Sequence, residues 1–448
     1  MISIRFFRGF SAALGLAGAL LAATPAQAVP SFARQTGQDC AACHIGAYGP
    51  QLTPYGTRFK IGGYTDSDGK SGKVPVSGMV VASFTHTAKD QPEKPADGYS
   101  KNDNFALDEA SLFLAGKLAD NIGSFVQLTY DGIGKSTALD QMDFRFARAT
   151  EFQDKELTFG FSLNNNPGVQ DPWNTMPIWS FPYVGTALGY GGPDAATLIN
   201  GGLEQRVLGV SAYAFYDKSW YAELGTYRSL STWSQGKIGL DKSEDPGKLH
   251  SGSAYWRLAY MQDLKSTAWS VGLFGLHADV QPDRHSGPSN SYNDMGVDAQ
   301  YQFLGTREHI FTVQSSYIRE RQGRDALFAN GEATHSVGYL NEFKLNTSYN
   351  FRQTWGATLG YFSTIGSSDE LVYADNIRQR PNTQGETLQL DWTPFGKEDS
   401  WGAPWANVRL GAQYTHFAKY NGASNNYDGT GRNASNNDTL FLFAWTSF

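Results

Sequence analysis

Cysteine is nearly absent from this chain of 448 residues, which contains two cysteines, six methionines and eight histidines. Two cysteines exclude a disulfide-rich fold and a zinc site built from two cysteine pairs. Long apolar runs are also missing, since no window after residue 28 offers 18 consecutive apolar residues, and this excludes a helical membrane protein. Positive charge is not in excess, because the net charge is −7, so nucleic acid is not an expected partner.

The two cysteines lie together, because residues 40–44 read C-A-A-C-H. The C-x-x-C-H spacing is typical of c-type haem attachment. Two thiols form thioether bonds to the vinyl groups of one haem, and the adjacent histidine lies against the porphyrin face, where its imidazole binds iron. The motif therefore predicts one covalent haem c, with Cys40 and Cys43 as attachment sites and His44 as iron ligand.

Three alternatives apply to the same motif: a disulfide, half of a zinc site, or a redox pair of the thioredoxin type. A structural zinc site needs four ligands, and no second cysteine pair supplies them. A thioredoxin-type pair is expected in a cytosolic βαβ context, which this sequence lacks.

The start of the chain has the pattern of a secretory signal. Arg5 and Arg8 precede an apolar run over residues 10–23, and residues 26–28 read A-Q-A. The run is shorter than the roughly 20 residues that span a bilayer as a helix. We therefore expect residues 1–28 to be a signal peptide, which agrees with the motif because bacteria attach haem c outside the cytoplasm.

From residue 76 onward the sequence alternates apolar with polar or small residues, which is the period of a β-strand. In one segment Trp355 and Leu359 fall on one face while Thr354 and Thr358 fall on the other. The pattern predicts sixteen strands, over residues 76–88, 104–118, 122–132, 139–150, 155–163, 206–216, 218–228, 253–263, 267–279, 292–304, 308–320, 335–350, 353–365, 384–395, 404–418 and 437–448.

The lengths of these strands and of their connections indicate a membrane barrel. Membrane-spanning strands need about 9–11 residues, whereas strands of soluble proteins average about 5–6. Short turns follow the even-numbered strands and mostly long loops follow the odd-numbered ones, and the chain ends on the aromatic Phe448, as bacterial outer-membrane barrels do. We therefore predict an all-β fold: an antiparallel outer-membrane β-barrel of about 16 strands over residues 76–448, with both termini on the periplasmic side.

A barrel of sixteen strands leaves an aqueous lumen. The strand register predicts inward-facing charges at Asp143, Arg145, Arg257, Asp298, Asp391 and Arg409. The longest loop, residues 164–205, either folds inward and constricts the pore or caps the outer mouth.

Residues 29–75 form the predicted haem segment. They are too few to enclose a haem alone, and their prolines and glycines leave room for one short helix near the motif. We therefore expect the barrel to supply the rest of the pocket, with the haem in the periplasmic mouth or in the lumen.

The haem segment also resembles a known family. Residues 30–37 read P-S-F-A-R-Q-T-G and precede the C-A-A-C-H motif. The further matching residues are Pro50, Leu52, Thr53, Gly56, Phe59, Lys60, Gly63 and Tyr64. With a barrel of this size, they resemble the fused monohaem cytochrome-porins of the bacterial outer membrane, whose best-known members are the iron oxidases of iron-oxidising bacteria. The resemblance implies thioether bonds at Cys40 and Cys43 and proximal ligation by His44.

Two functions follow as hypotheses. The first is electron transfer between an extracellular donor, with Fe²⁺ as the candidate, and a periplasmic cytochrome or other carrier; an iron-oxidase-type activity would belong here. The second is a solute-uptake porin with a structural or regulatory haem. No constellation for hydrolysis or group transfer stands out. The barrel would also contact outer-membrane lipid.

The sixth iron position is open in the sequence. Met79 and His86 are the nearest downstream candidates, and their odd spacing places them on opposite faces of the first strand. The other candidates are Met142, Met176, Met261, Met295, His250, His277, His285, His309, His335 and His416.

Overall fold

The computed structural model describes residues 30–70, 72–250, 252–397, 400 and 402–448. The predicted signal peptide, residues 1–28, lies outside the described residues. Within the described part, no helix combines the length and apolar character needed to cross a membrane.

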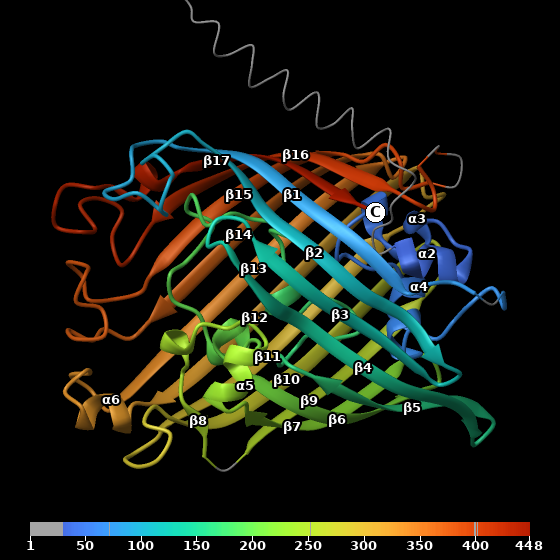
Figure 1. The fold of residues 1–448 in the computed structure, drawn as a ribbon, viewed down its shortest axis with the longest axis horizontal. Helices are drawn as coiled ribbons and strands as arrows, with labels where there is room; N and C mark the ends of the chain where they lie inside the picture. The colour runs from blue at the N-terminus through green and yellow to red at the C-terminus, as the bar shows by residue number, and fades with distance from the viewer. Residues whose placement is uncertain (1–29, 71, 251, 398–399, 401) are drawn as a thin grey trace, which may run out of the picture.

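The described chain folds into one closed antiparallel sheet of sixteen long strands, as predicted (Figure 1). Successive long strands pair with each other, and the first pairs with the last, Met79 lying opposite Ser447, so the barrel closes. The strands are β1 (Val76–Thr87), β2 (Asn104–Ala119), β3 (Ile122–Asp131), β4 (Ser136–Phe152), β5 (Lys155–Asn164), β6 (Val207–Tyr216), β7 (Trp220–Ser229), β9 (Ser253–Asp263), β10 (Thr267–Gln281), β11 (Asn290–Phe303), β12 (His309–Gly323), β13 (Val337–Phe351), β14 (Trp355–Gly366), β15 (Thr383–Trp392), β16 (Asn407–Lys419) and β17 (Thr439–Ser447). A two-residue strand that was not predicted, β8 (Lys248–Leu249), pairs with the end of β10.

The two faces of the strands are inverted relative to a soluble protein. On β15, Leu388 and Leu390 are exposed on the outside while Gln389 is buried inside. An apolar outer surface around a polar interior is the arrangement of a membrane barrel, so the outer face contacts lipid. The predicted inward-facing charges are all buried in the interior: Asp143, Arg145, Arg257, Asp298, Asp391 and Arg409.

The haem segment lies within one end of the barrel, beside the start of β1 (Figure 1). It contains α2 (Pro30–Thr36), α3 (Cys40–Cys43), the 3₁₀ turn η1 (Ile45–Ala47) and α4 (Pro54–Ile61). The expectation of a single short helix is therefore wrong. Pro30 and Pro54 begin helices rather than break them. The N–H groups of the first helical turn have no partner within the helix, so proline, which lacks an N–H, fits there.

The long loop between β5 and β6 folds into the barrel, which decides between the two positions considered for it. Trp173 is buried and its ring packs edge-on to Tyr221 of β7, 5.2 Å between ring centroids. Asp171 lies 3.2 Å from the guanidinium of Arg257 on β9. Two single turns lie in this loop, η2 (Pro177–Trp179) and the π-type η3 (Leu198–Gly202).

The other long loops carry α5 (Thr232–Lys237), η4 (Lys242–Glu244), α6 (Asp325–Ala329) and η5 (Ala434–Asn437), at the end of the barrel away from the haem segment (Figure 1).

Candidate haem site

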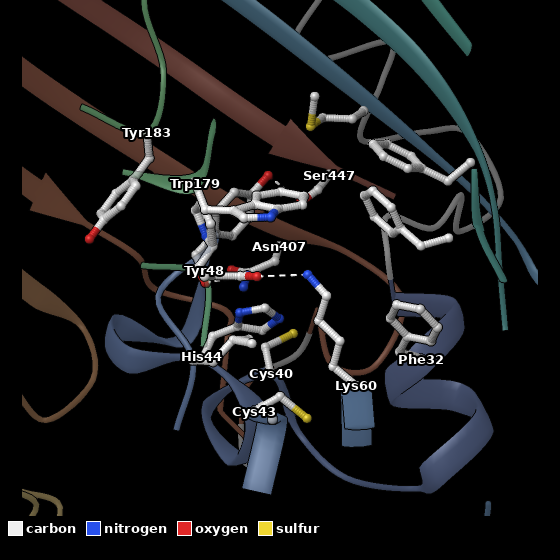
Figure 2. Close-up of a pocket in the computed structure, with 18 of the residues that line it drawn as sticks. Phe32, Cys40, Cys43, His44, Tyr48, Lys60, Trp179, Tyr183, Asn407 and Ser447 are labelled. Atoms are coloured by element: carbon white, nitrogen blue, oxygen red, sulfur yellow. Dashed lines mark hydrogen bonds between the residues drawn. The ribbon is translucent and has the colours of Figure 1, made fainter. Parts of the chain in front are cut away.

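The C-x-x-C-H motif is shaped by a single helical turn. The side chain of Asp39 accepts a hydrogen bond from the N–H of Ala42 at 2.9 Å and so caps α3. The N–H of His44 donates to the carbonyl of Cys40 at 2.9 Å, which closes the turn. Because residues three apart lie on one face of a helix, the two sulfur atoms point the same way, as Figure 2 shows.

Both cysteines and His44 line one cavity of about 380 Å³, within the range of cofactor pockets. Its wall comes from three parts of the chain. The haem segment contributes Phe32, Tyr48 and Phe59, the barrel contributes Met79, Phe113, Phe125 and Trp445, and the inward loop contributes Trp179 and Tyr183. The barrel and loop thus supply the surroundings that the short segment lacks.

The donor set fits a covalently attached haem. The two thiols are not joined in a disulfide. Burial raises the pKa of Cys40 to about 11 and that of Cys43 to about 12. Across the described residues, no group of three or more His, Cys, Asp or Glu side chains is arranged to hold a metal ion.

The imidazole of His44 is held in its neutral form. Burial lowers its pKa to about 4, and the charge of Arg409 acts in the same direction, while the backbone of Gly49 partly offsets both. Neutral imidazole is the form that binds iron. The predicted ligand therefore has the protonation state that its role requires.

Helix α4 packs directly on the motif. The N–H of Thr53 donates to the carbonyl of Cys43 at 2.8 Å, and the Thr53 hydroxyl donates to the carbonyl of Ala42 at 2.5 Å. A Cβ on Gly56 would lie 2.4 Å from the Cys43 carbonyl oxygen, closer than real contacts allow. Glycine at this position is what lets α4 approach the motif.

The barrel wall holds the haem segment through its backbone carbonyls. Arg409 donates to the carbonyls of Gly46 at 3.3 Å and Tyr48 at 2.9 Å. Four further wall side chains do the same, Gln302 to Leu52, Asn407 to Ala47, Arg145 to Lys60 and Tyr213 to Ile61. Since these groups sit on strands spread around the barrel, the segment is fixed in position from several sides.

The comparisons with known proteins concern the barrel. The chain is similar to OprB of Pseudomonas putida at 12% identity and a TM-score of 0.48, over 83% of this chain and 94% of that chain. It is similar to an anion-selective porin from Comamonas acidovorans at 12% identity and a TM-score of 0.45, over 83% of this chain and 98% of that chain. It is also similar to the outer-membrane channel DcaP of Acinetobacter baumannii at 10% identity and a TM-score of 0.44, over 83% of this chain and 96% of that chain. No family model and no curated protein matches the chain.

Of the candidates for the sixth iron position, Met79 lines the cavity. His86 faces away from it, with Nδ1 2.7 Å from the carboxylate of Asp103 at the exposed end of β1. Within the described chain, the other candidates lie outside the lining of the cavity, and Met176, for example, packs in a separate core beside Tyr255.

Sequence reasoning gave no role to Lys60, Trp179 or Tyr183, which also line the cavity. The position of Lys60 could have been predicted from its spacing, because it lies one helical turn after Gly56 and so shares the face of α4 that meets the motif. The two aromatic residues carried none, since their position depends on how the long loop folds.

Proposed function

We propose that this protein is a fused monohaem cytochrome-porin that transfers electrons between an extracellular donor, with Fe²⁺ as the leading candidate, and a periplasmic carrier. One observation carries the proposal: the three chemically essential side chains of a C-x-x-C-H motif converge on a mostly apolar cavity inside a closed membrane barrel. The resemblance of residues 30–64 to the cytochrome-porins supports it.

The side chains of the motif and of the cavity wall have different proposed roles. Cys40 and Cys43 would hold a haem by thioether bonds, and His44 would bind its iron. The haem, when bound, supplies reversible one-electron chemistry. The aromatic side chains around it, including Tyr48, Trp179 and Trp445, exclude water and lower the local dielectric, which sets how strongly nearby charges act on the iron.

The position of the site matters for the proposed direction of transfer. The lipid is an insulator, so electrons cross the membrane only where the protein holds a redox centre within it. The haem segment enters the barrel at the end where the chain has its short turns, which the alternation of loop lengths identifies as the periplasmic end. A haem there is within reach of a soluble periplasmic carrier docking at the barrel mouth.

A solute-uptake porin with a structural haem is the second candidate, and the sixteen-strand barrel is equally suited to it. Against it, the haem segment and the inward loop both occupy the interior.

The test is anaerobic visible spectroscopy on the haem-loaded protein in detergent. We expect Fe²⁺ to produce the reduced c-type α-band promptly, and a His44→Ala variant that keeps its thioether-bound haem to lose this response. Reduction by dithionite but not by Fe²⁺ would contradict Fe²⁺ as donor. Absence of a c-type spectrum in a protein matured with haem would overturn the whole proposal.

A further inference from the structure

The cavity contains a buried amino group. Lys60 is 5% exposed and its side chain enters the cavity from α4. In the view of Figure 2, the sulfur atoms of Cys40 and Cys43 lie between the imidazole of His44 on one side and the chain of Lys60 on the other. Because Cys40, Cys43, His44 and Lys60 line the same cavity, a porphyrin attached at the two sulfurs would share that cavity with the Lys60 side chain.

The amino group is held by two uncharged acceptors and an aromatic ring. The Nζ atom donates to the carbonyl of Val169 at 2.7 Å and to Oδ1 of Asn174 at 2.8 Å. These two acceptors use two of its tetrahedral positions, and no carboxylate among the described residues forms a salt bridge with it. The ring of Trp179 lies 4.6 Å from Nζ.

A buried amino group that forms no salt bridge is costly when charged. Burial lowers the pKa of Lys60 to about 7 and the charge of Arg145 acts in the same direction, while the carboxylates of Asp143, Asp171 and Glu223 partly offset both. The neutral amine keeps two N–H donors for Val169 and Asn174 and leaves its lone pair in the remaining position. This is the arrangement required of a nitrogen ligand.

The competing donors in the cavity are less well placed. Met79 stands on β1 in the barrel wall, packed in an apolar cluster with Phe113 and Phe443. The hydroxyl of Tyr48 is engaged with the hydroxyl of Ser447. Lys60, by contrast, stands on the helix that packs on the motif itself, with Gly56 one turn earlier against Cys43.

We propose that Lys60 is the sixth ligand of the haem iron, with its Nζ bound on the face opposite His44. The inference rests on the proposed function, because it requires the covalent haem. In this step the neutral amino group donates its lone pair to the ferric iron, so it releases no proton and no electron is transferred. The contacts with Val169 and Asn174 make the inward loop a positioning element for this ligand.

The experiment uses electron paramagnetic resonance and near-infrared magnetic circular dichroism of the ferric, haem-loaded full chain in detergent. We expect a low-spin signal with the charge-transfer band of histidine and amine ligation and without the far-red band of methionine ligation. Lys60→Arg keeps a long side chain with N–H donors but cannot bind iron, so the low-spin signal should be lost to a high-spin or water-bound form. Lys60→Met should restore a six-coordinate haem with the methionine band.

One control variant tests the competing sulfur ligand. Met79→Leu removes the sulfur from the barrel wall but none of the hydrogen bonds of Lys60, so it should keep the wild-type low-spin spectrum. Heat-modifiable migration on gels checks that each barrel is folded, and the pyridine haemochrome assay checks that each haem is attached.

The inference is overturned if Lys60→Arg keeps the wild-type spectrum, or if Met79→Leu removes a methionine band from the wild-type one. In either case Fe²⁺ still reduces the haem and the proposed function stands. A wild-type chain without covalent haem overturns both proposals together.

Discussion

At the scale of single residues, the C-x-x-C-H motif fits into the barrel because glycines stand where the chain comes close. Gly56 meets the Cys43 carbonyl, and Gly46 meets the side chains of Asn350 and Arg409, where a Cβ would lie 2.6 Å and 3.1 Å from the nearest atom of each. Gly46 also has φ of +69°, which a side chain tolerates poorly. The segment can thus turn tightly within the barrel.

We predict that Gly56→Ala separates α4 from the haem motif. The new Cβ meets a backbone carbonyl, which cannot rotate away, so we expect an overpacking cost of about 1–3 kcal/mol and a lower ratio of haem to protein. The measurement is the pyridine haemochrome assay on purified protein, together with the melting temperature.

Gly192→Ala is the matched control for Gly56→Ala. A Cβ at residue 192 meets nothing within 4 Å, so both the haem content and the melting temperature should equal those of the wild type. If the two alanine variants behave alike, the close approach of α4 is not what positions the motif.

At the scale of elements, the barrel could be predicted from the sequence because lipid on one side and water on the other impose a strict alternation. The predicted strand boundaries are wrong where turns interrupt this alternation. The strands predicted to begin at residues 218 and 353 begin at Trp220 and Trp355, since Lys218 and Gln353 have φ of +54° and belong to tight hairpin turns. The two residues of β8 are too few to show a period.

Of the candidate haem site, only the C-x-x-C-H motif could be predicted from the sequence. The C-x-x-C-H spacing identifies Cys40, Cys43 and His44, and all three line the cavity. The rest of the wall combines β1, β2, β3, β4, β16 and β17 with the inward loop, and these residues meet only after the barrel has closed. In the local sequence, side chains such as Phe113 and Trp179 cannot be distinguished from other aromatic residues of barrel strands and loops.

Two long loops at the end of the barrel away from the haem segment are joined by one carboxylate. Asp369, after β14, is buried and lies 3.2 Å from the guanidinium of Arg324. It accepts hydrogen bonds from the N–H groups of Thr334 and His335 in the preceding loop, at 2.9 Å and 3.0 Å, and from Leu371 and Val372 in its own. Burial alone would raise its pKa, but these four N–H groups hold the pKa of Asp369 well below its usual 3.8.

We predict that this junction is insensitive to mild acid and sensitive to loss of charge. Because the folded pKa of Asp369 is depressed, its stabilising contribution is fully present above pH 3.8 and is lost only as the pH falls through the lower folded value. Asp369→Asn should weaken the junction at neutral pH by about 1.5–3 kcal/mol, the value of hydrogen bonds to a charged group.

Limited proteolysis of the two loops measures this effect. Residues 324–336 and 367–382 should be cleaved faster in Asp369→Asn at pH 7, and the wild-type loops should be cleaved no faster at pH 5 than at pH 7 by a protease whose activity is matched at the two values. Replacement of the exposed Glu370 by Gln is the control. Equal cleavage of both variants would contradict the role of Asp369.

At the scale of the whole molecule, the barrel is wide enough for a channel, but the haem segment and the inward loop occupy its interior. The haem segment enters from one end, and the inward loop meets it through Lys60, whose amino group binds Val169 and Asn174. Both parts are held by polar side chains of the wall, such as Arg409 for the segment and Arg257 for the loop. A route for solutes needs an open interior, whereas a conduit for electrons does not.

We therefore predict that the wild-type barrel passes little current and that deleting residues 30–64 opens it. The deletion leaves the donors of Arg409, Gln302 and Asn407 without their carbonyl partners, but water entering the lumen replaces these hydrogen bonds, so the barrel should still fold. Single-channel conductance in planar bilayers is the measurement, with heat-modifiable migration confirming the folded barrel. A wild-type conductance as large as that of the deletion variant would favour the solute-uptake porin, because the haem segment would then obstruct nothing.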